Sequence, residues 1–595
     1  MINFDATREY SGPVPFWYWN GDLREEKLLE QMAEIRAKGI YEFFIHARKG
    51  LEIEFLSEAW FDRVELVLTD ARRHGMKIWI YDELNWPSGM AGGKVTAHPE
   101  FVEHYLTDSN EVKITRTILP SKTEYQEEEA AAITKESCPD YLNKASAETF
   151  IELAYQPYFE RFENDFGSTI QGFFSDEIRF ANARPWSHAL GEDIPKGADY
   201  FKKLGAAISE NYFATIANWC EDRHVEFIGH VMGEETLGSQ VRYVSSIFNV
   251  LGQFHRPGVD HLGPCAEGSH PRIAASISHM SGNPKVTCET FGGCSWDMTP
   301  QDLFRISGWL FASGITQIIL HGFSYEEQRD DWPPNLFVDW KHWNEMGEYV
   351  EWCGRVQHFL AKATPVCRVG LYYPYEEFLE DYKPDTRFTL NFTDGARIQG
   401  KTANKLHLSM QELGAELLKA GIDYDIVPRQ YLDKFEGDIL VAPSATRPAF
   451  NGTVIGQGEQ SAAECIARVD KKLGQRPRLI GENTAPSPQP ASEYISDPYF
   501  HNHGDDAGVL LKEFILDGQS AFLVWNANEH EFDGGLLLGK TKEFHSYDPI
   551  QNQWAKNRGQ ELTIHLQPYS MKIIVEKTDG NRSLRCPCCR PAGVE

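Results

Sequence analysis

Short β-rich runs alternate with segments of helical periodicity from residue 14 to about residue 322. This alternation is typical of βαβ units, in which a helix returns the chain so that the next strand runs parallel to the last. The predicted strands cover residues 15–20, 40–45, 77–81, 170–174, 225–228, 258–261, 285–288 and 315–320. Because repeats of this kind close most naturally into a barrel, the sequence predicts an α/β protein built on a (β/α)8 TIM barrel.

Helix boundary signals support the same alternation. Asp22 with Glu25 three residues later is a capping-box arrangement that predicts the first helix, and Gly39 ends it. The helix after the seventh strand is predicted to open with Thr299 as N-cap and Pro300 at its first position.

The barrel is expected to span residues 1–363, interrupted at about residues 94–150 by an insertion that would form a subdomain or lid. The insertion contains the acidic run Glu127-Glu128-Glu129. Strand, helix, strand and strand patterns over residues 364–505 predict a small α/β domain, whose segment 450–505, rich in Gly, Pro, Ser and Gln, we expect to be loop-like. Alternating runs over residues 506–578 predict a C-terminal all-β, sandwich-like domain.

Residues 579–595 are expected to form a disordered tail, although Cys586, Cys588 and Cys589 could form half of a zinc site. The odd number of cysteines, 11, favours a reduced intracellular protein over a disulfide framework. The N-terminus does not resemble a signal peptide, and no stretch approaches the roughly 18 apolar residues of a membrane span. We therefore expect a cytoplasmic protein, and the sequence leaves a homo-oligomer open.

The net charge of −29 argues against nucleic acid or an anionic membrane as partner, because both require clustered Lys and Arg. The 15 Trp and 24 Tyr residues suit sugar rings, but they also suit a large core. Trp17 and Trp19 lie on the first strand, and at least one of them is expected in the core. Trp19 and Trp296 are nevertheless candidates for contact with a sugar.

Nearly every predicted strand ends in a residue able to do chemistry. These residues are Asn20, His46, Arg48, Asp82, Glu83, Asp176, Glu177, His230, His261, Glu289 and His321. Because the carboxyl ends of barrel strands converge on the face that carries the active site, we expect these side chains to share one site.

Glu177 and Glu289 follow the fourth and seventh strands and would face each other across the barrel mouth. Hydrolysis of a glycosidic bond needs one carboxylic acid to protonate the leaving oxygen and a second carboxylate as nucleophile or base. We assign the acid role to Glu177, because the like charge of Asp176 and desolvation by the preceding Phe173-Phe174 would raise its pKa and keep it protonated. The alternative for either glutamate is a salt bridge at the barrel rim.

Further carboxylates near the strand ends are candidates for holding the sugar. Asp82 and Glu83 could bind vicinal hydroxyls while Trp86 lies beneath the ring. Glu234 and Glu235, just past the fifth strand, could bind sugar hydroxyls, act as rival catalytic carboxylates or cap the following helix.

Six segments occur in the order of a known family: PFWYWNGDL, FFIHARKGL, WIYDELNWPSGMAGG, FFSDE, VDHLG and ETFGGCSWDMTPQDL. Over about residues 13–325 the chain resembles the barrel of the α-L-rhamnosidase-like enzymes of glycoside hydrolase family 106. The resemblance implies cleavage of a terminal deoxy-sugar with inversion, often with calcium near the sugar, and implies that Glu177 and Glu289 are catalytic. Members of that family are usually larger and secreted. The α/β domain resembles a shortened form of the amidotransferase-like domain that follows the barrel in some β-galactosidases.

Two other functions fit part of the pattern. His230 and His261 could serve a metal-dependent hydrolase of the amidohydrolase kind, although the His-x-His pair usual on the first strand is replaced by Trp-Tyr-Trp-Asn. The barrel could also bind sugar without turnover, but the paired glutamates speak against that function. The sequence predicts a glycoside hydrolase acting on a carbohydrate, with the metal requirement unknown.

Overall fold

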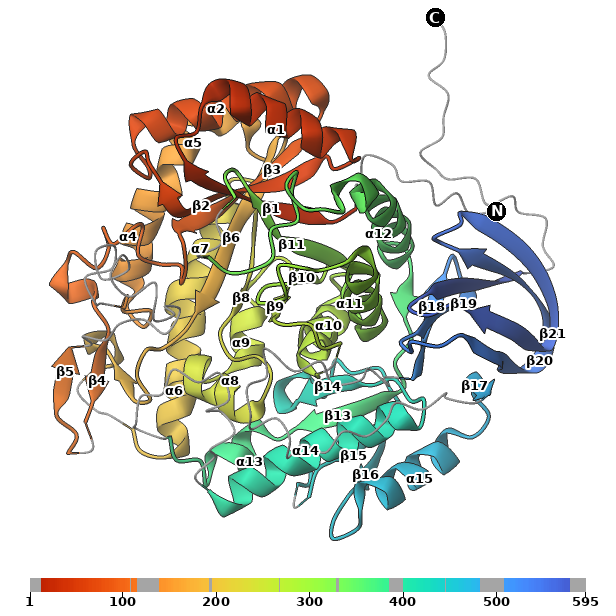
Figure 1. Cartoon of the computed structure of the whole chain (residues 1–595). Coiled ribbons are helices and arrows are strands. Elements are labelled where there is room, and N and C mark those ends of the chain that lie inside the picture. Colours follow the sequence, from red (N-terminus) through yellow and green to blue (C-terminus); the bar gives the residue numbers. More distant parts are fainter. Residues whose placement is uncertain are drawn as a thin grey trace, which may run out of the picture.

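A parallel sheet of eight strands lies at the centre of the computed structural model and curls into a barrel (Figure 1). The structure describes residues 12–107, 109–114, 138–191, 195–266, 268–327, 331–384, 400–444, 446–481 and 508–577. The barrel strands are β1 (Val14–Gly21), β2 (Glu42–Leu51), β3 (Lys77–Leu84), β6 (Ile170–Ile178), β8 (Glu226–Val231), β9 (Gly258–His261), β10 (Thr287–Thr290) and β11 (Gln317–Ser324).

In space these strands follow the order β8-β6-β3-β2-β1-β11-β10-β9. A parallel bridge between Ile228 of β8 and Arg256, just before β9, brings the two ends of that order together. Each of the eight predicted strands is present, so the predicted TIM barrel is confirmed.

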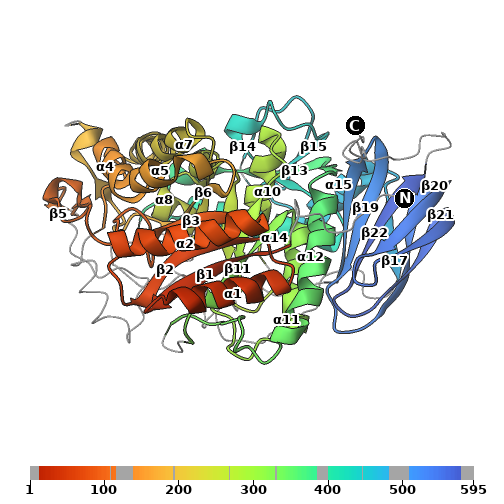
Figure 2. The ribbon, with the colours of Figure 1, turned by 90° about the horizontal axis from the view of Figure 1, so that it is seen from above.

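Helices cover the outside of the barrel, and Figure 2 shows α1 and α2 lying over the strands that precede them. The helices between and after the barrel strands are α1 (Glu25–Ala37), α2 (Glu58–His74), α4 (Lys144–Ala154), α5 (Gln156–Phe162), α6 (Ala198–Ile208), α7 (Ala214–Glu221), α8 (Leu237–Val244), α9 (Ile247–Leu251), α10 (His270–Ser281), α11 (Pro300–Ser313) and α12 (Met346–Leu360). Short 3-10 helices lie at Pro99–Phe101, Glu163–Asp165, His188–Leu190, Trp343–Glu345 and Arg429–Tyr431, and a π-helical turn lies at Ser209–Phe213. No helix in these described ranges has the length and apolar character needed to cross a membrane.

The predicted helix signals are confirmed in part. Thr299 accepts the backbone N–H of Asp302 and the Asp302 carboxylate accepts that of Thr299, so the N-cap of α11 is confirmed. Gly39 follows α1 with φ of 84°, a left-handed conformation that suits glycine. The capping box predicted at Asp22 is wrong, because this carboxylate instead accepts the Tyr325 hydroxyl at 2.8 Å from the loop after β11.

Successive side chains on a barrel strand point alternately into the barrel and towards the helices. The inward residues form one apolar cluster, made of Val14, Phe16, Tyr18, Phe44, Trp79, Tyr81, Phe174, Ile228 and Ile319. Trp17 and Trp19 belong to the larger cluster between strands and helices. The barrel interior is therefore filled with side chains below its carboxyl-terminal end.

The insertion between β3 and β6 contributes a small antiparallel sheet together with a later strand. Its strands are β4 (His104–Leu106), β5 (Val112–Ile114) and β7 (Pro185–Trp186), in the order β5-β4-β7. The acidic run Glu127-Glu128-Glu129 lies outside the described residues.

A second parallel sheet follows the barrel, with the order β14-β13-β15-β16. Its elements are β13 (Val369–Tyr373), α13 (Tyr375–Leu379), α14 (Lys401–Lys419), β14 (Asp425–Pro428), β15 (Ile439–Ala442), β16 (Thr453–Gly456) and α15 (Ala462–Leu473). The prediction that residues 450–505 are loop-like is wrong over β16 and α15. Nearly all of the Gly, Pro, Ser and Gln residues that suggested a loop lie outside these two elements, in the segments around them and in residues 482–505.

The last part of the chain forms a seven-stranded antiparallel sheet beside α11 and α12 (Figure 1). Its strands are β12 (Thr364–Pro365), β17 (Arg478–Gly481), β18 (Val509–Leu516), β19 (Gln519–Asn526), β20 (Phe532–Asp548), β21 (Gln553–Leu566) and β22 (Met571–Lys577). The predicted C-terminal β structure is confirmed, and β12 and β17 join it from upstream of residue 506. The tail with Cys586, Cys588 and Cys589 lies outside the described residues.

Candidate active site

One layer of inward side chains occupies the carboxyl-terminal end of the barrel, and two of its members, Tyr18 and Tyr81, also belong to the apolar cluster below. The strand alternation places Tyr18, His46, Tyr81, Asp176, His230, Asp260, Glu289 and His321 in this layer. Each of the eight strands contributes one member, and seven of the eight are buried. Five members of the layer are predicted site residues, namely His46, Asp176, His230, Glu289 and His321, and the other three are Tyr18, Tyr81 and Asp260.

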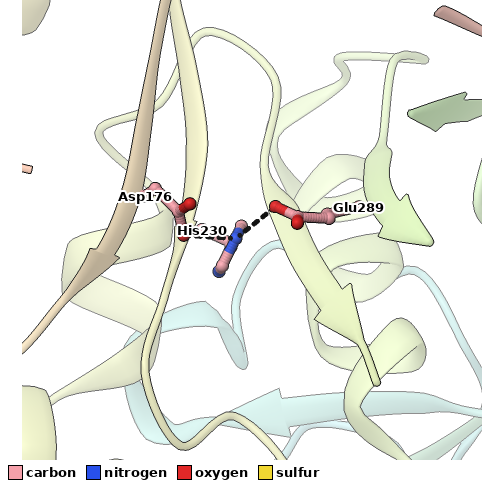
Figure 3. Close-up of side chains that lie close together, drawn as sticks. All are labelled: Asp176, His230 and Glu289. Atoms are coloured by element: carbon pink, nitrogen blue, oxygen red, sulfur yellow. Dashed lines mark hydrogen bonds and ion pairs between the residues drawn. The ribbon is translucent and has the colours of Figure 1, made fainter. Parts of the chain in front are cut away.

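His230 lies between two carboxylates at the centre of this layer (Figure 3). Its Nε2 atom lies 3.0 Å from Asp176 Oδ1 and 3.0 Å from Glu289 Oε2. Burial alone would lower the pKa of His230, but the charges and hydrogen bonds of the two carboxylates raise it well above its ordinary value. The ring is therefore an imidazolium that links β6, β8 and β10.

Glu289 receives a second imidazole. His321 Nδ1 lies 3.2 Å from its Oε1, so both carboxylate oxygens have a histidine partner. Burial would raise the pKa of Glu289, but the hydrogen bonds and charges of His230 and His321 lower it far below its ordinary value. Glu289 is therefore ionised.

Glu177 occupies an irregular end of β6. The pairing of β6 with β8 shifts register between Ser175 and Ile178, and Glu177 adopts φ of 44°. A bulge of this kind turns a side chain away from the direction that strict alternation would give it. The carboxylate accepts Arg179 Nη1 at 2.7 Å, and Arg179 is fully buried with no partner among the described residues for its Nε and Nη2 atoms.

The surroundings of Glu177 shift its pKa in the opposite direction to the shift at Glu289. Burial raises the pKa of Glu177 to about 7, the charge of Arg179 lowers it, and the charges of Asp176 and Glu289 raise it. Near neutral pH the Glu177 carboxyl therefore holds a proton for much of the time, while Glu289 does not.

Arg48 forms the opposite part of the same end of the barrel. Its guanidinium pairs with both oxygens of Asp331 at 2.7 and 3.0 Å, and lies over the rings of Tyr18 and Trp86. His46 stacks on Tyr81 with ring centroids 3.4 Å apart. Burial and the charge of Arg48 lower the pKa of His46 well below its ordinary value, so that ring is neutral.

Comparisons with known proteins bear on the family and the fold. A family model described as alpha-L-rhamnosidase, glycoside hydrolase family 106, matches residues 197–379, which include His230, Asp260, Glu289 and His321. Over these residues the chain resembles the glycosidases of family 106. A comparison with curated proteins finds no significant match.

Solved structures share the fold of this glycosidase at low sequence identity. The rhamnosidase from Novosphingobium sp. PP1Y has a TM-score of 0.67 and 9% identity, over 99% of this chain and 84% of that chain. A catalytic mutant of a GH42 β-galactosidase from G. stearothermophilus has a TM-score of 0.58 and 9% identity, over 96% and 100% of the two chains. The β-galactosidase from Rahnella sp. R3 has a TM-score of 0.56 and 9% identity, over 95% and 98%.

Two residues predicted to contact the sugar face the helices of the glycosidase instead. Trp19 is fully buried, with its ring 5.0 Å from that of Trp60. His261 stacks on His270 and packs at a tilt against Trp309, with ring centroids 5.3 and 4.7 Å away. Neither residue therefore joins the layer, because each is adjacent in sequence to the inward residue of its strand.

Asp82 and Glu83 organise the loop after β3 and do not reach the layer. Asp82 accepts the hydroxyls of Ser88 at 2.5 Å and of Tyr155 at 2.6 Å, and burial raises the pKa of Asp82 to about 8. Glu83 accepts the backbone N–H groups of residues 90, 91 and 92 at 2.5–2.8 Å. Both residues are almost fully buried, and the structure does not bring their carboxyls into the layer that contains Glu289. They hold the loop that carries Trp86.

Four other predicted residues either hydrogen-bond the backbone or lie nearer the surface. Asn20 exchanges hydrogen bonds with the backbone of Glu326, which joins β1 to the loop after β11. Glu234 accepts the backbone N–H groups of Val231 and Asp260, at 3.0 and 2.7 Å, and so ties β8 to β9. Glu235 is exposed and Trp296 is half-buried.

Sequence reasoning missed five residues of the site: Tyr18, Tyr81, Arg179, Asp260 and Asp331. Tyr18, Tyr81 and Asp260 could have been found by following the inward side of each strand. Arg179 and Asp331 lie beyond regular strand positions, so alternation gives no signal for them.

Asp176, His230 and Glu289 are close enough to hold a metal ion together, because their ligand atoms lie within 4.8 Å of one another. Calcium takes about six to eight oxygen ligands, whereas this set contributes one imidazole nitrogen at its centre. The set therefore does not fit the calcium that the family resemblance implies.

The metal-dependent hydrolase alternative needs His230 and His261 in one site. His230 faces the barrel interior, whereas His261 faces α10 and α11. The pair that motivated this alternative is therefore not formed.

Proposed function

We propose that this glycosidase removes a terminal sugar from a glycoside, with Glu177 as general acid and Glu289 as its ionised partner. The observation that carries the proposal is the opposite protonation of two glutamates at one end of the barrel. Pairs of carboxyls whose surroundings move their pKa values apart are typical of acid and base roles in one site.

Glu177 suits the acid role because it is close to half-protonated near neutral pH, with a pKa of about 7. Its protonated carboxyl would donate to the glycosidic oxygen as the bond to the anomeric carbon breaks. Arg179 fixes one carboxyl oxygen and thereby orients the side chain. After proton transfer, the same Arg179 charge would stabilise the carboxylate that remains.

Glu289 would act from the other side of the sugar. Its negative charge would stabilise the positive charge that develops on the sugar ring, and it would orient the attacking water and take its proton. The assignment to water activation follows the inversion that the family resemblance implies. His230 and His321 keep this carboxylate ionised and in place.

The substrate class rests on the comparisons. The matching family model is described as alpha-L-rhamnosidase, and one structure of the same fold is a rhamnosidase. A terminal α-L-rhamnoside or a related deoxy-sugar is therefore the substrate that we propose, with β-D-galactoside as the second to test.

A panel of nitrophenyl glycosides tests this proposal, with α-L-rhamnoside and β-D-galactoside first. We expect hydrolysis of the α-L-rhamnoside, and proton NMR should detect the β-anomer before mutarotation. A first-formed α-anomer would assign Glu289 to nucleophilic attack instead. Binding of a monosaccharide without turnover of any glycoside would contradict the proposal and favour a non-catalytic sugar-binding barrel.

A further inference from the structure

Asp260 stands beside Glu289 at the same height of the barrel. The two residues are direct partners in the parallel pairing of β9 with β10. Neighbours in register on a parallel sheet point to the same face. Val259 and His261, on either side of Asp260, pack against the helices. The Asp260 side chain therefore points to the same side as the Glu289 carboxylate.

One oxygen of this carboxyl has no hydrogen-bond partner in the described part of the protein. Asp260 Oδ1 is enclosed, although the residue as a whole is only partly buried. Buried polar oxygens nearly always have a hydrogen-bond partner. An unpaired oxygen next to a reacting group therefore suggests that a bound ligand supplies the partner.

The backbone at this position is held in place. The Asp260 N–H donates to Glu234 Oε2 at 2.7 Å, and Glu234 also accepts the Val231 N–H at 3.0 Å. Glu234 thus fixes the end of β9 against the end of β8. The Asp260 side chain is presented on a rigid element, as a specific binding group requires.

The charges around Asp260 favour its neutral form. Burial and the charges of Glu289, Glu177 and Asp176 raise the pKa of Asp260, and the charge of His230 opposes them. A neutral carboxyl offers one O–H donor and one carbonyl acceptor, which is the pair that a sugar hydroxyl needs.

We propose that Asp260 binds a ring hydroxyl of the terminal sugar and helps to select which sugar is cleaved. This inference rests on the proposed function, since it places the sugar against Glu289. Asp260 would contact a hydroxyl close to the anomeric carbon, because Glu289 faces that carbon. Asp260 is therefore a binding and specificity residue, and it transfers no proton.

The test compares Asp260→Ala and Asp260→Asn with the wild-type enzyme. For Asp260→Ala we expect a rise in KM of about 10-fold to 100-fold, with kcat changed much less. Asp260→Asn should recover most of the lost affinity, because an amide also offers one donor and one acceptor. Asp199→Ala, at an exposed position on α6, is the matched control and should leave KM unchanged.

Deoxygenated substrates identify the hydroxyl. Nitrophenyl glycosides that lack one ring hydroxyl at a time should abolish the effect of Asp260→Ala at one position only. Circular dichroism and the melting temperature of each variant show whether it is folded, and binding of the free monosaccharide by calorimetry gives a second measurement.

Two results would overturn the inference. One is that Asp260→Ala binds the free sugar as tightly as the wild type. The other is that Asp260→Asn loses more than about 100-fold in kcat together with the acid limb of the pH profile, which would make Asp260 an ionised base. If the wild type binds the sugar through Asp260 but hydrolyses nothing, the inference holds while the proposed function fails.

Discussion

Glu177 and Glu289 carry the same carboxyl group and differ in the charges around them. Two imidazoles contact Glu289, whereas Glu177 has one guanidinium and two neighbouring carboxylates. The surroundings alone therefore distinguish an acid from a base in the proposed mechanism.

Replacing either glutamate by glutamine tests these roles. We expect Glu177→Gln and Glu289→Gln each to lower kcat by more than about 100-fold, because an amide cannot transfer the proton. The melting temperature should change little, since the side-chain volume is kept. A substrate with a good leaving group should restore much of the activity of Glu177→Gln but not that of Glu289→Gln. Near-normal turnover would remove the residue concerned from the mechanism.

The pH profile depends on Arg179. Glu177 must hold its proton, so the rate should fall as the pH rises through about 7, the pKa of this carboxyl. The Arg179 charge lowers that pKa, so Arg179→Gln should move the alkaline limb upwards by about one pH unit.

Arg179→Lys is the matched control, because it keeps the charge and should keep the limb near its wild-type position. The measurement is kcat/KM against pH for the three proteins. An alkaline limb that stays in place in Arg179→Gln would mean that another group supplies the proton.

At the scale of elements, the loop between β3 and the insertion is organised around one buried carboxyl. Glu83 accepts three consecutive backbone N–H groups, from Met90 to Gly92, and this loop places Trp86 over Arg48. The loop therefore connects the buried Glu83 to Trp86, which forms part of the candidate site.

Glu83→Ala should leave those N–H groups buried and unpaired. We expect a loss of at least about 2 kcal/mol in the free energy of unfolding and a rise in KM. Hydrogen exchange should quicken at residues 88–92 and stay unchanged in α12. Glu100→Ala, at an exposed position, is the control. Unchanged exchange in the loop would show that Glu83 does not hold it.

At the scale of the whole molecule, a buried ionic cluster joins the barrel, the parallel sheet and the antiparallel sheet. Asp423, just before β14, pairs with Arg272 of α10 and with Lys512 of β18, the latter at 2.8 Å. Asp425 of β14 pairs with His279 of α10 at 2.7 Å. Arg272 and Lys512 are each 3% exposed, so their charges depend on these partners.

Asp423→Asn should therefore destabilise the protein by about 3–5 kcal/mol, because it leaves two buried cations without their counter-ion. Denaturant unfolding should lose its single cooperative transition, measured by tryptophan fluorescence and circular dichroism together.

The pH dependence of stability gives a second check on this cluster. Lys512 and Arg272 lower the pKa of Asp423, so its contribution is present above the ordinary aspartate pKa and is lost as the pH falls below it. Asp438→Asn, in an exposed pair with Arg368, should cost less than about 1 kcal/mol. Equal effects of the two variants would contradict the role of the cluster.

Much of the fold could be predicted because strands and helices are encoded over short distances. All eight barrel strands and the Thr299 cap follow from local patterns. The direction of single side chains was harder to predict. Trp19 and His261 face the helices, whereas their neighbours Tyr18 and Asp260 face inwards, because the alternation of the strand and not the chemical type of a residue sets its direction.

The sequence by itself determined the barrel and the strand ends at which Glu177 and Glu289 stand, because hydrophobic periodicity and turn residues act locally. Only the tertiary structure decided which carboxyls face the site and which of them keep a proton. Those properties depend on burial and on charges from distant segments, such as His230 and His321 beside Glu289, and on the bulge that turns Glu177. Such contacts form only when the barrel closes.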